Sequence, residues 1–424
     1  SLVPQLSVAP VVSSGQIVRV VGLTLEAKGI AAPLGAYCQV ENPDSGTFID
    51  AEVVGFQADL LYLMPFTDPS GIGPGAKIWV RSKNSKMPIG RNMLGRVVDG
   101  LGRPIDGQGP IQYDAHLSLE GEPINPMERG PIEKVLDTGI KAIDTCLTLG
   151  QGQRIGLMAG SGVGKSVLLG MLTRNTEADV VVIGLIGERG REVQEFIHQT
   201  LGPNGLKKAI VVASPANESP VVRLKAANLT HLIAEYFRDQ GKDVLLMMDS
   251  ITRFALAQRE IGLSVGEPPT TKGYPPSTFS MIPKLLERAG TSEGNGSITG
   301  LYTVLVEGDD LSEPVSDAVR AVLDGHIVLD RELAAHNHYP AIDVLSSVSR
   351  LMIDVISKDH YNLSMKMRDF IATYNEAKDL INIGAYAKGS NPKWDIAINK
   401  IDRINDYLKQ GIMETATMEE CLNA

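Results

Sequence analysis

The residues of this chain best suited to chemistry form one short stretch, Ala159-Gly-Ser-Gly-Val-Gly-Lys-Ser166. An apolar run at 154–158 precedes it and predicts a buried strand, while residues 167–172 predict the start of a helix. Its three glycines let the backbone curl so that several N–H groups converge on one anion. The helix adds its positive N-terminal end at the same point. The stretch therefore predicts a phosphate-binding loop in a nucleotide-binding protein.

Each residue of this loop has an expected task. Lys165 supplies a point charge for the terminal phosphates, and the Ser166 hydroxyl is a ligand for Mg²⁺. The strict pattern begins with glycine where this chain has Ala159, whose side chain is small enough to be accommodated. The alternative is a glycine-rich turn that carries a lysine. The predicted nucleotide-binding residues are Gly160, Ser161, Gly162, Val163, Gly164, Lys165, Ser166 and Val167.

A metal ion bound at Ser166 needs a carboxylate to hold and orient it, and Asp249 is the candidate. Residues 243–248 are apolar after the first and predict a buried strand. Asp249 then falls at the carboxyl edge of a sheet, where α/β proteins bind their ligands. An aspartate at the end of an apolar strand is common, so only its combination with the phosphate loop predicts a Walker B carboxylate.

Hydrolysis also needs a carboxylate that orients the attacking water. Glu188 follows an apolar run at 180–185, which predicts a strand beside the phosphate loop, and it is the predicted catalytic base. Arg189 is predicted to take part in catalysis by positioning Glu188, and Glu192 to contact the metal ion through water. The alternative is a solvated, charged turn after a strand.

Size and charge limit the class of protein. At 424 residues the chain is too long for one core and predicts two or three domains. A net charge of −10 argues against nucleic acid as a partner, because phosphate backbones are bound by clustered Lys and Arg. No apolar run approaches the ~18 residues that a bilayer span requires, and no signal peptide is visible. Cys38, Cys146 and Cys421 are far apart and odd in number, which indicates reduced thiols in a cytosolic protein.

The order of elements predicts three domains, 1–91, 92–345 and 346–424. Short strands separated by turns predict a small N-terminal β-barrel, with strands at 16–23, 36–41, 49–56, 60–65 and 77–81. A Gly/Pro-rich connector follows at 99–109.

The second domain alternates strands with helices, which predicts an α/β fold with a mostly parallel sheet covered on both faces. Its strands are expected at 154–158, 180–185, 209–213, 243–248, 297–306 and 326–329. The strands stop at about 345, and helices expected at 360–383 and 392–410 predict a C-terminal helical domain.

Five segments taken together resemble the catalytic subunits of rotary ATPases, and among these most closely the flagellar and type III secretion export ATPases. The likeness covers nearly the whole chain. Its segments are the phosphate loop, the Glu188 cluster, Asp249-Ser-Ile-Thr-Arg-Phe-Ala-Leu-Ala-Gln-Arg-Glu260, Gly273-Tyr-Pro-Pro-Ser277 and His338-Tyr-Pro-Ala-Ile-Asp343. The phosphate loop and Gly384-Ala-Tyr-Ala-Lys-Gly-Ser390 are more similar to flagellar than to virulence-type members.

The resemblance implies a RecA-like P-loop NTPase core that hydrolyses ATP with Mg²⁺. It implies a homo-hexameric ring with active sites between subunits. It further implies a cytoplasmic protein, peripherally associated with an export gate at the cytoplasmic face of the inner membrane. The implied partners are a stator-like regulator, a central stalk protein, and export substrates with their chaperones.

Three positions are assigned through the resemblance alone. Arg350, in Ser346-Ser-Val-Ser-Arg350, matches the catalytic arginine finger that reaches a neighbour's γ-phosphate, a task that suits a planar guanidinium. Tyr339 matches the nucleotide-binding aromatic residue that packs on adenine. The second adenine-side aromatic of rotary catalytic subunits falls on Ile412, which leaves the base contact partly apolar.

Residues 262–280 are rich in Gly and Pro and predict a long irregular loop. By resemblance this loop, with Tyr274, faces the central opening of the ring and meets the stalk protein. The alternative is a rigid surface loop.

Several functions remain open. The first is an export ATPase, the second a catalytic subunit of a proton-coupled rotary ATPase or synthase, and the third a non-catalytic nucleotide-binding ring subunit. Glu188 argues against the third, because such subunits typically lack this carboxylate, and the residues around it favour the first over the second. A ring-shaped nucleic-acid translocase is disfavoured by the negative charge and by a β domain without interleaved basic and aromatic residues.

Overall fold

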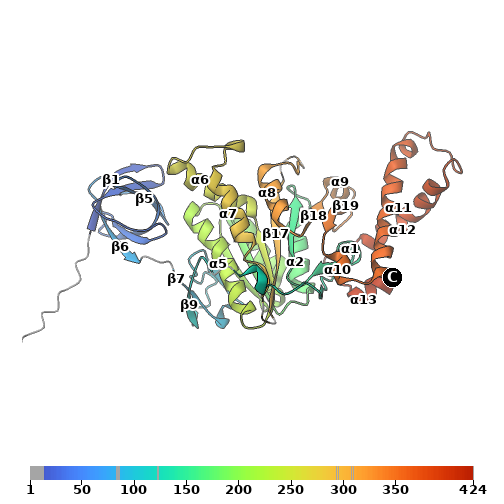
Figure 1. The fold of residues 1–424 in the computed structure, drawn as a ribbon, viewed down its shortest axis with the longest axis horizontal. Coiled ribbons are helices and arrows are strands. Elements are labelled where there is room, and N and C mark those ends of the chain that lie inside the picture. The colour runs from blue at the N-terminus through green and yellow to red at the C-terminus, as the bar shows by residue number, and fades with distance from the viewer. Residues whose placement is uncertain are drawn as a thin grey trace, which may run out of the picture.

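The computed structural model describes residues 14–82, 86–121, 124–292, 294, 296–306, 308 and 310–423. Figure 1 shows an elongated molecule with a β-barrel at one end, a sheet flanked by helices in the middle and a helical hairpin at the other end. Among the helices of these ranges, none combines the length and the apolar character that a membrane span requires.

The N-terminal barrel closes with six strands in the order β1-β2-β5-β4-β3-β6. Buried and half-buried residues alternate along β3, so Cys38 and Val40 point into the barrel core. Strand β2 is not predicted, because the first predicted strand, at 16–23, runs through a tight turn at Gly22, whose φ is 56°. The strands are β1 Ser14–Val21, β2 Thr24–Lys28, β3 Tyr37–Glu41, β4 Phe48–Gln57, β5 Leu60–Pro65 and β6 Lys77–Ser82.

The central sheet has the order β19-β18-β12-β17-β15-β13-β14-β8, with β16 paired to β17. Neighbours from β18 to β8 are parallel, whereas β19 and β16 are antiparallel to their partners. The mostly parallel α/β fold is confirmed. The strands are β8 Val97–Asp99, β12 Arg154–Ala159, β13 Val180–Ile186, β14 Ala209–Ser214, β15 Asp243–Asp249, β16 Gly290–Thr291, β17 Ser297–Leu305, β18 Gly325–Leu329 and β19 Ile342–Ser349. Two smaller sheets pair β7 Lys86–Ile89 with β9 Ala115–Ser118, and β10 Val135–Leu136 with β11 Leu149–Gly150.

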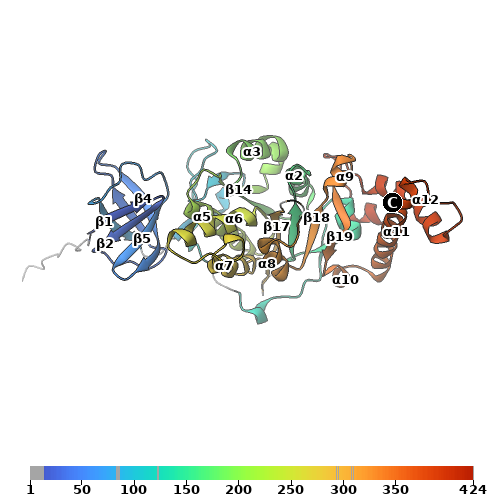
Figure 2. The ribbon, with the colours of Figure 1, turned by 90° about the horizontal axis from the view of Figure 1, so that it is seen from above.

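Two hydrophobic cores cover the two faces of this sheet. Along β13, Val180 and Val182 belong to one core with residues of α5 to α8, while Val181 and Ile183 belong to the other with residues of α1 and α2. Figure 2 shows the helices on both sides of the strands. The helices are α1 Lys141–Cys146, α2 Lys165–Asn175, α3 Gly190–Glu195, α4 Gly202–Leu206, α5 Pro220–Arg238, α6 Ile251–Ser264, α7 Pro276–Leu286, α8 Pro314–Val322, α9 Arg331–Ala335, α10 Met352–Val355, α11 Lys358–Asn382, α12 Pro392–Leu408 and α13 Met418–Asn423. Both faces of the sheet are therefore buried in hydrophobic cores, as is usual for a parallel sheet.

The end domains are tied to the centre by specific contacts. Lys225 of α5 forms an ion pair with Glu52 of the barrel, and its ammonium lies 5.5 Å from the ring centroid of Phe66. At the other end, Ile404 and Leu408 of α12 join the hydrophobic core around α1 and α2. The domain limits at 91 and 345 stay a prediction.

Three expectations about elements need correction. The strand β8 was not expected, because it is short and pairs with β14 more than a hundred residues later. The strand β19 continues beyond 345 as an antiparallel edge strand to Ser349. The ends of the loop expected at 262–280 belong to α6 and α7, so the loop itself spans 265–275 and includes a 3-10 turn at Thr271–Gly273. Within it, Tyr274 is 9% exposed beneath the guanidinium of Arg259, and its contact with a stalk protein stays a prediction.

Candidate active site

The phosphate loop lies between β12 and α2, as the sequence predicts. Gly162 and Gly164 have φ angles of 81° and 89°, in the left-handed region that favours glycine. A Cβ added at Gly162 would meet nothing within 4 Å, so its glycine serves the backbone conformation rather than close packing. The loop therefore curls directly into the N-terminus of an 11-residue helix, which favours bound anions.

Lys165 lies between the two predicted carboxylates. Its Nζ donates to Asp249 Oδ1 at 2.6 Å and lies 3.7 Å from Glu188 Oε1. The three side chains are 13%, 6% and 12% exposed, so these charges meet in a largely desolvated space. Burial lowers the pKa of Lys165, but the charges of Asp249 and Glu188 outweigh burial and raise the pKa above its usual value. The lysine is fully protonated and ready to meet phosphate.

Asp249 is held from the neighbouring strand. Strand β17 lies between β12 and β15, and its Thr303 hydroxyl donates to Asp249 Oδ1 at 2.7 Å. Lys165 contacts the same oxygen, and among the described residues Oδ2 of Asp249 accepts no hydrogen bond. One oxygen is thus fixed by the protein while the other remains available to a cation. Thr303 is not among the predicted site residues, because nothing local marks a threonine within an apolar strand.

The environment of Glu188 changes its acidity. Burial raises the pKa of Glu188 to about 7, and the charge of Asp249 acts in the same direction, whereas the charge of Lys165 opposes them. Its Oε1 is buried without a hydrogen-bond partner in the described chain. A carboxylate with a pKa near neutrality and an unsatisfied oxygen is suited to accept a proton from water.

The remaining charged residues near Glu188 differ in position. Arg189 is 81% exposed and donates to Glu192 at 3.3 Å, while Glu192 itself interacts with the Glu188 side chain and raises its pKa. Arg253 of α6, which the sequence analysis did not single out, packs against Gly187, and its Nε is buried without a hydrogen bond in the described residues. Its charge lowers the pKa of Glu188. The signal available in the sequence was an arginine one helical turn beyond Asp249.

Tyr339 lies beside the phosphate loop. A Cβ added at Gly164 would come within 3.3 Å of its ring, which is therefore in contact with the start of α2. The backbone N–H of Gln410 donates to the Tyr339 carbonyl at 2.8 Å, and Arg174 of α2 donates to the Ile412 carbonyl at 2.8 Å. Tyr339, Ile412 and Val167 all leave apolar surface exposed. The packing of adenine on Tyr339 and beside Ile412 stays a prediction.

Arg350 lies near the opposite ends of the strands from the phosphate loop. Leu329 pairs with Ile342 at the level of the phosphate loop, whereas Gly325 pairs with Ser349 at the far end of β18. Four residue steps of ~3.3 Å place Arg350 more than ~13 Å along the strands from the loop. An open pocket of about 540 Å³ lies at that end of the strands, lined in part by Asp324 and Leu351. The structure does not bring Arg350 to the phosphate loop of its own chain.

The residues that would hold nucleotide and Mg²⁺ fit that task. The loop and the N-terminus of α2 would take the phosphates, with Lys165 on the terminal groups. Ser166 and Asp249 would hold the metal ion, and Mg²⁺ usually relies on one or two protein groups plus phosphates and water. No cluster of three or more metal-ligating His, Cys, Asp or Glu side chains is present within the described part of the chain.

Comparison with known proteins gives matches along the whole chain. Residues 139–349 match the nucleotide-binding domain of the ATP synthase alpha/beta family, and residues 17–79 match the beta-barrel domain of the same family. Residues 356–424 match the C-terminal domain of the type III secretion ATPase EscN.

Individual relatives are similar over nearly their full length. The flagellum-specific ATP synthase of Pseudomonas aeruginosa is 52% identical over 419 residues, which cover 98% of this chain and 92% of the relative. The assembled ATPase EscN from the type III secretion system of enteropathogenic E. coli superposes with a TM-score of 0.90 at 43% identity, covering 96% of this chain and 98% of EscN. EscN in complex with its central stalk EscO gives a TM-score of 0.88 at 42% identity, with the same coverage.

Fold and site together define a P-loop protein of the α/β class, with a phosphate loop, an acidic strand end and a second carboxylate at one sheet edge. The matches then make the assignment specific. The chain belongs to the family of flagellum-specific and type III secretion ATPases.

Replacing Glu188 by Gln is expected to separate nucleotide binding from turnover. The amide keeps the size of the side chain but cannot accept a proton from water, so kcat should fall at least ~100-fold while ATP affinity stays near that of the parent. Steady-state hydrolysis and equilibrium binding check this. Glu195→Gln removes the same charge from α3 at an exposed position and should leave kcat unchanged. A turnover within a few-fold of the parent for Glu188→Gln would remove Glu188 from the chemistry.

The raised pKa of Glu188 predicts an acid limb in the pH profile. The active form is the carboxylate, so kcat/KM should level off about one pH unit above 7 and fall below pH 7, approaching ~tenfold per unit. The terminal phosphate of ATP itself titrates in the same pH range, so Glu188→Gln is the control. The residual kcat/KM of this variant should depend much less on pH below 7. A parent profile that is flat from pH 8 to pH 6 would contradict the assignment.

Proposed function

We propose that this chain hydrolyses Mg²⁺–ATP in a homo-hexameric ring, at active sites shared between neighbouring copies, and that hydrolysis powers or primes flagellar-type protein export. The observation that carries the proposal is the division of the catalytic groups between two edges. Lys165, Asp249 and Glu188 lie together at one edge of the sheet, while Arg350 lies at the other. A site that needs both sets requires two copies.

The chemistry follows from the contacts. Lys165 would exchange its contact with Asp249 for the terminal phosphates, while Thr303 keeps Oδ1 of Asp249 in place and Oδ2 faces the shell of the metal ion. Glu188 would then orient the attacking water, with Arg189 and Glu192 at its margin. Arg350 of a neighbouring copy would stabilise charge on the phosphoryl group during transfer, a contribution typically worth ~10³-fold or more.

The oligomer and its partners are proposed from the relatives. The assembled state of EscN and its complex with the central stalk EscO support a ring with a stalk for this chain. A stator-like regulator, export substrates and their chaperones complete the proposed partners. A cytoplasmic location, with peripheral association at the export gate of the inner membrane, accords with the family of this chain.

The other candidate functions are less well supported. A non-catalytic ring subunit has no need of a buried carboxylate with a pKa of about 7 beside the phosphate loop, yet Glu188 has both features. A catalytic subunit of a proton-coupled rotary ATPase shares the nucleotide site. The 52% identity to a flagellum-specific relative and the match of residues 356–424 to a secretion ATPase domain favour export.

Mixed assemblies test the shared site. Arg350→Ala should bind ATP and barely hydrolyse it, and Lys165→Ala should be inactive because the loop loses its cation. Mixing the two variants should restore part of the activity, because some interfaces then pair an intact loop with an intact arginine. ATPase rates of the mixture and of each variant alone at equal total concentration provide the measurement. Rings shown to contain both variants but without recovery would exclude a shared site.

A further inference from the structure

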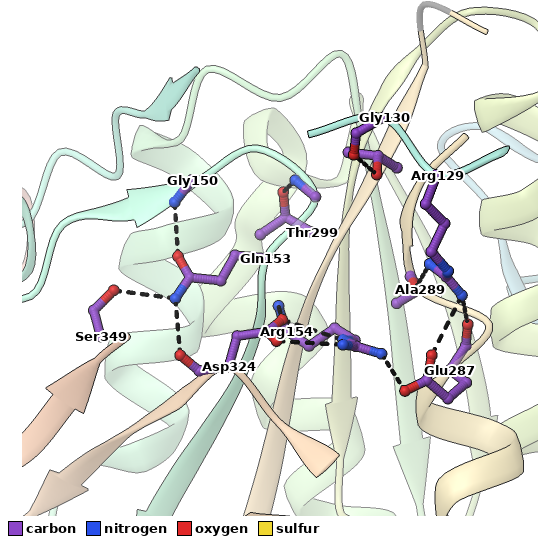
Figure 3. Close-up of polar contacts among 12 residues, drawn as sticks. Arg129, Gly130, Gly150, Gln153, Arg154, Glu287, Ala289, Thr299, Asp324 and Ser349 are labelled. Carbon is purple, nitrogen blue, oxygen red and sulfur yellow. Dashed lines mark hydrogen bonds and ion pairs between the residues drawn. The ribbon is translucent and has the colours of Figure 1, made fainter. Parts of the chain in front are cut away.

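The backbone at Arg350 is held by a buried amide. Gln153, fully buried just before β12, donates through Nε2 to the carbonyl of Asp324 at 3.3 Å and to Ser349 Oγ at 3.0 Å. Its Oε1 accepts from the Gly150 N–H at 2.8 Å. Figure 3 shows the amide between these three segments. All of its N–H groups are used, so the side chain has one orientation.

Both groups that accept hydrogen bonds from Gln153 are connected to the backbone of Arg350. Ser349 precedes it in the chain, and the Asp324 carbonyl also accepts from the backbone N–H of Arg350 at 3.0 Å. Ser349 Oγ donates in turn to the Thr148 carbonyl at 2.8 Å. The amide thus joins the chain immediately before Arg350 to the residue that anchors its backbone.

Asp324 is fixed from a second direction. Its carboxylate accepts from the backbone N–H of Arg154 at 2.9 Å, and from two guanidinium nitrogens of the same residue at 3.2 Å. The Arg154 guanidinium also lies 2.6 Å from Glu287. Figure 3 shows this line of charged groups along the sheet edge. Asp324 is therefore a rigid point of attachment rather than a mobile turn residue.

The side chain of Arg350 lacks such support. It is exposed, and in the described ranges no hydrogen bond or ion pair involves its guanidinium. A long side chain without partners is positioned only by the backbone that carries it, and an error of about 1 Å at a catalytic group costs on the order of 100-fold in rate. The accuracy with which Arg350 reaches a neighbour therefore depends on its backbone anchor.

We infer that Gln153 is a positioning residue for Arg350, and through it acts on hydrolysis in the neighbouring copy rather than in its own. This inference rests on the shared site proposed above. It assigns a catalytic consequence to a residue that touches neither nucleotide nor metal ion, at the end of β12 opposite the phosphate loop.

The test uses Gln153→Leu, which keeps the buried position apolar and removes both donors. Alone, this variant should lose roughly 10- to 100-fold in kcat, the range expected for a misplaced catalytic group, with ATP affinity within about twofold of the parent. Thr299→Val is the matched control. It removes another buried hydrogen bond at the same edge, from the Gly152 N–H to Thr299 Oγ1 at 2.8 Å, without touching residues 324 or 349. It should keep the kcat of the parent.

Complementation distinguishes positioning from general damage. Gln153→Leu mixed with Lys165→Ala should recover activity, because the Gln153 variant retains an intact phosphate loop. Mixed with Arg350→Ala it should recover none, because both variants then lack a working arginine. A variant that merely disturbs β12 would impair its own loop, and it would show the reverse pattern: recovery with Arg350→Ala and none with Lys165→Ala. Parent-like kcat, or failure to complement Lys165→Ala, overturns the inference.

Two further measurements keep the outcome unambiguous. The mixture of Arg350→Ala with Lys165→Ala is the reference. If it recovers activity but the mixture of Gln153→Leu with Lys165→Ala does not, the inference fails and the shared site stands. If the reference mixture also fails, the shared site falls and the inference with it. Should Gln153→Leu not fold, Ser349→Ala removes the same link from a half-buried position, and it should show the same selective complementation with a smaller loss in kcat.

Discussion

The rest of this structure has to keep one lysine in contact with two carboxylates. Lys165, Asp249 and Glu188 come from three separate segments, and their charges meet where little water is present. Removing one partner from such a buried set typically costs about 3–5 kcal/mol, because the remaining charges stay unpaired. The parallel sheet supplies the required rigidity, since β12, β15 and β13 are held in register between two hydrophobic cores. Two carboxylates this close together favour the arrival of a further cation, such as the metal ion of a metal–nucleotide complex.

The parts of the site that the sequence could predict are those whose signals are local. The glycine spacing of the phosphate loop, the apolar run before Asp249 and the strand before Glu188 each lie within a few residues, and the structure has the strand, turn and helix expected around them. The helices α11 and α12 were predictable for the same reason, because their apolar periodicity and the glycines beyond their ends are contiguous in the chain.

The features that were missed depend on distant partners. The short strand β8 exists because β14 is beside it, and β2 was concealed by a turn without the usual Asn or Asp. Thr303 and Gln153 are unremarkable in the sequence, and their roles appear only when Asp249 or Asp324 is brought within hydrogen-bonding distance. The burial of Tyr274 likewise follows from Arg259, which covers its ring from the preceding helix. Hydrogen bonds across a sheet and packing between helices carry no periodic signal along the chain.

The placement of the phosphate loop and Arg350 at opposite sheet edges also constrains symmetry. Copies that share a site in a ring meet through different surfaces, so their interface is heterologous rather than two-fold symmetric. A pair joined in this way contains one complete site and two half-sites, and any open row of copies has one site fewer than its members. Only closure makes the number of sites equal to the number of subunits. The last subunit to join therefore completes two sites at once, so that the yield of activity per added subunit is greatest at the step that closes the ring.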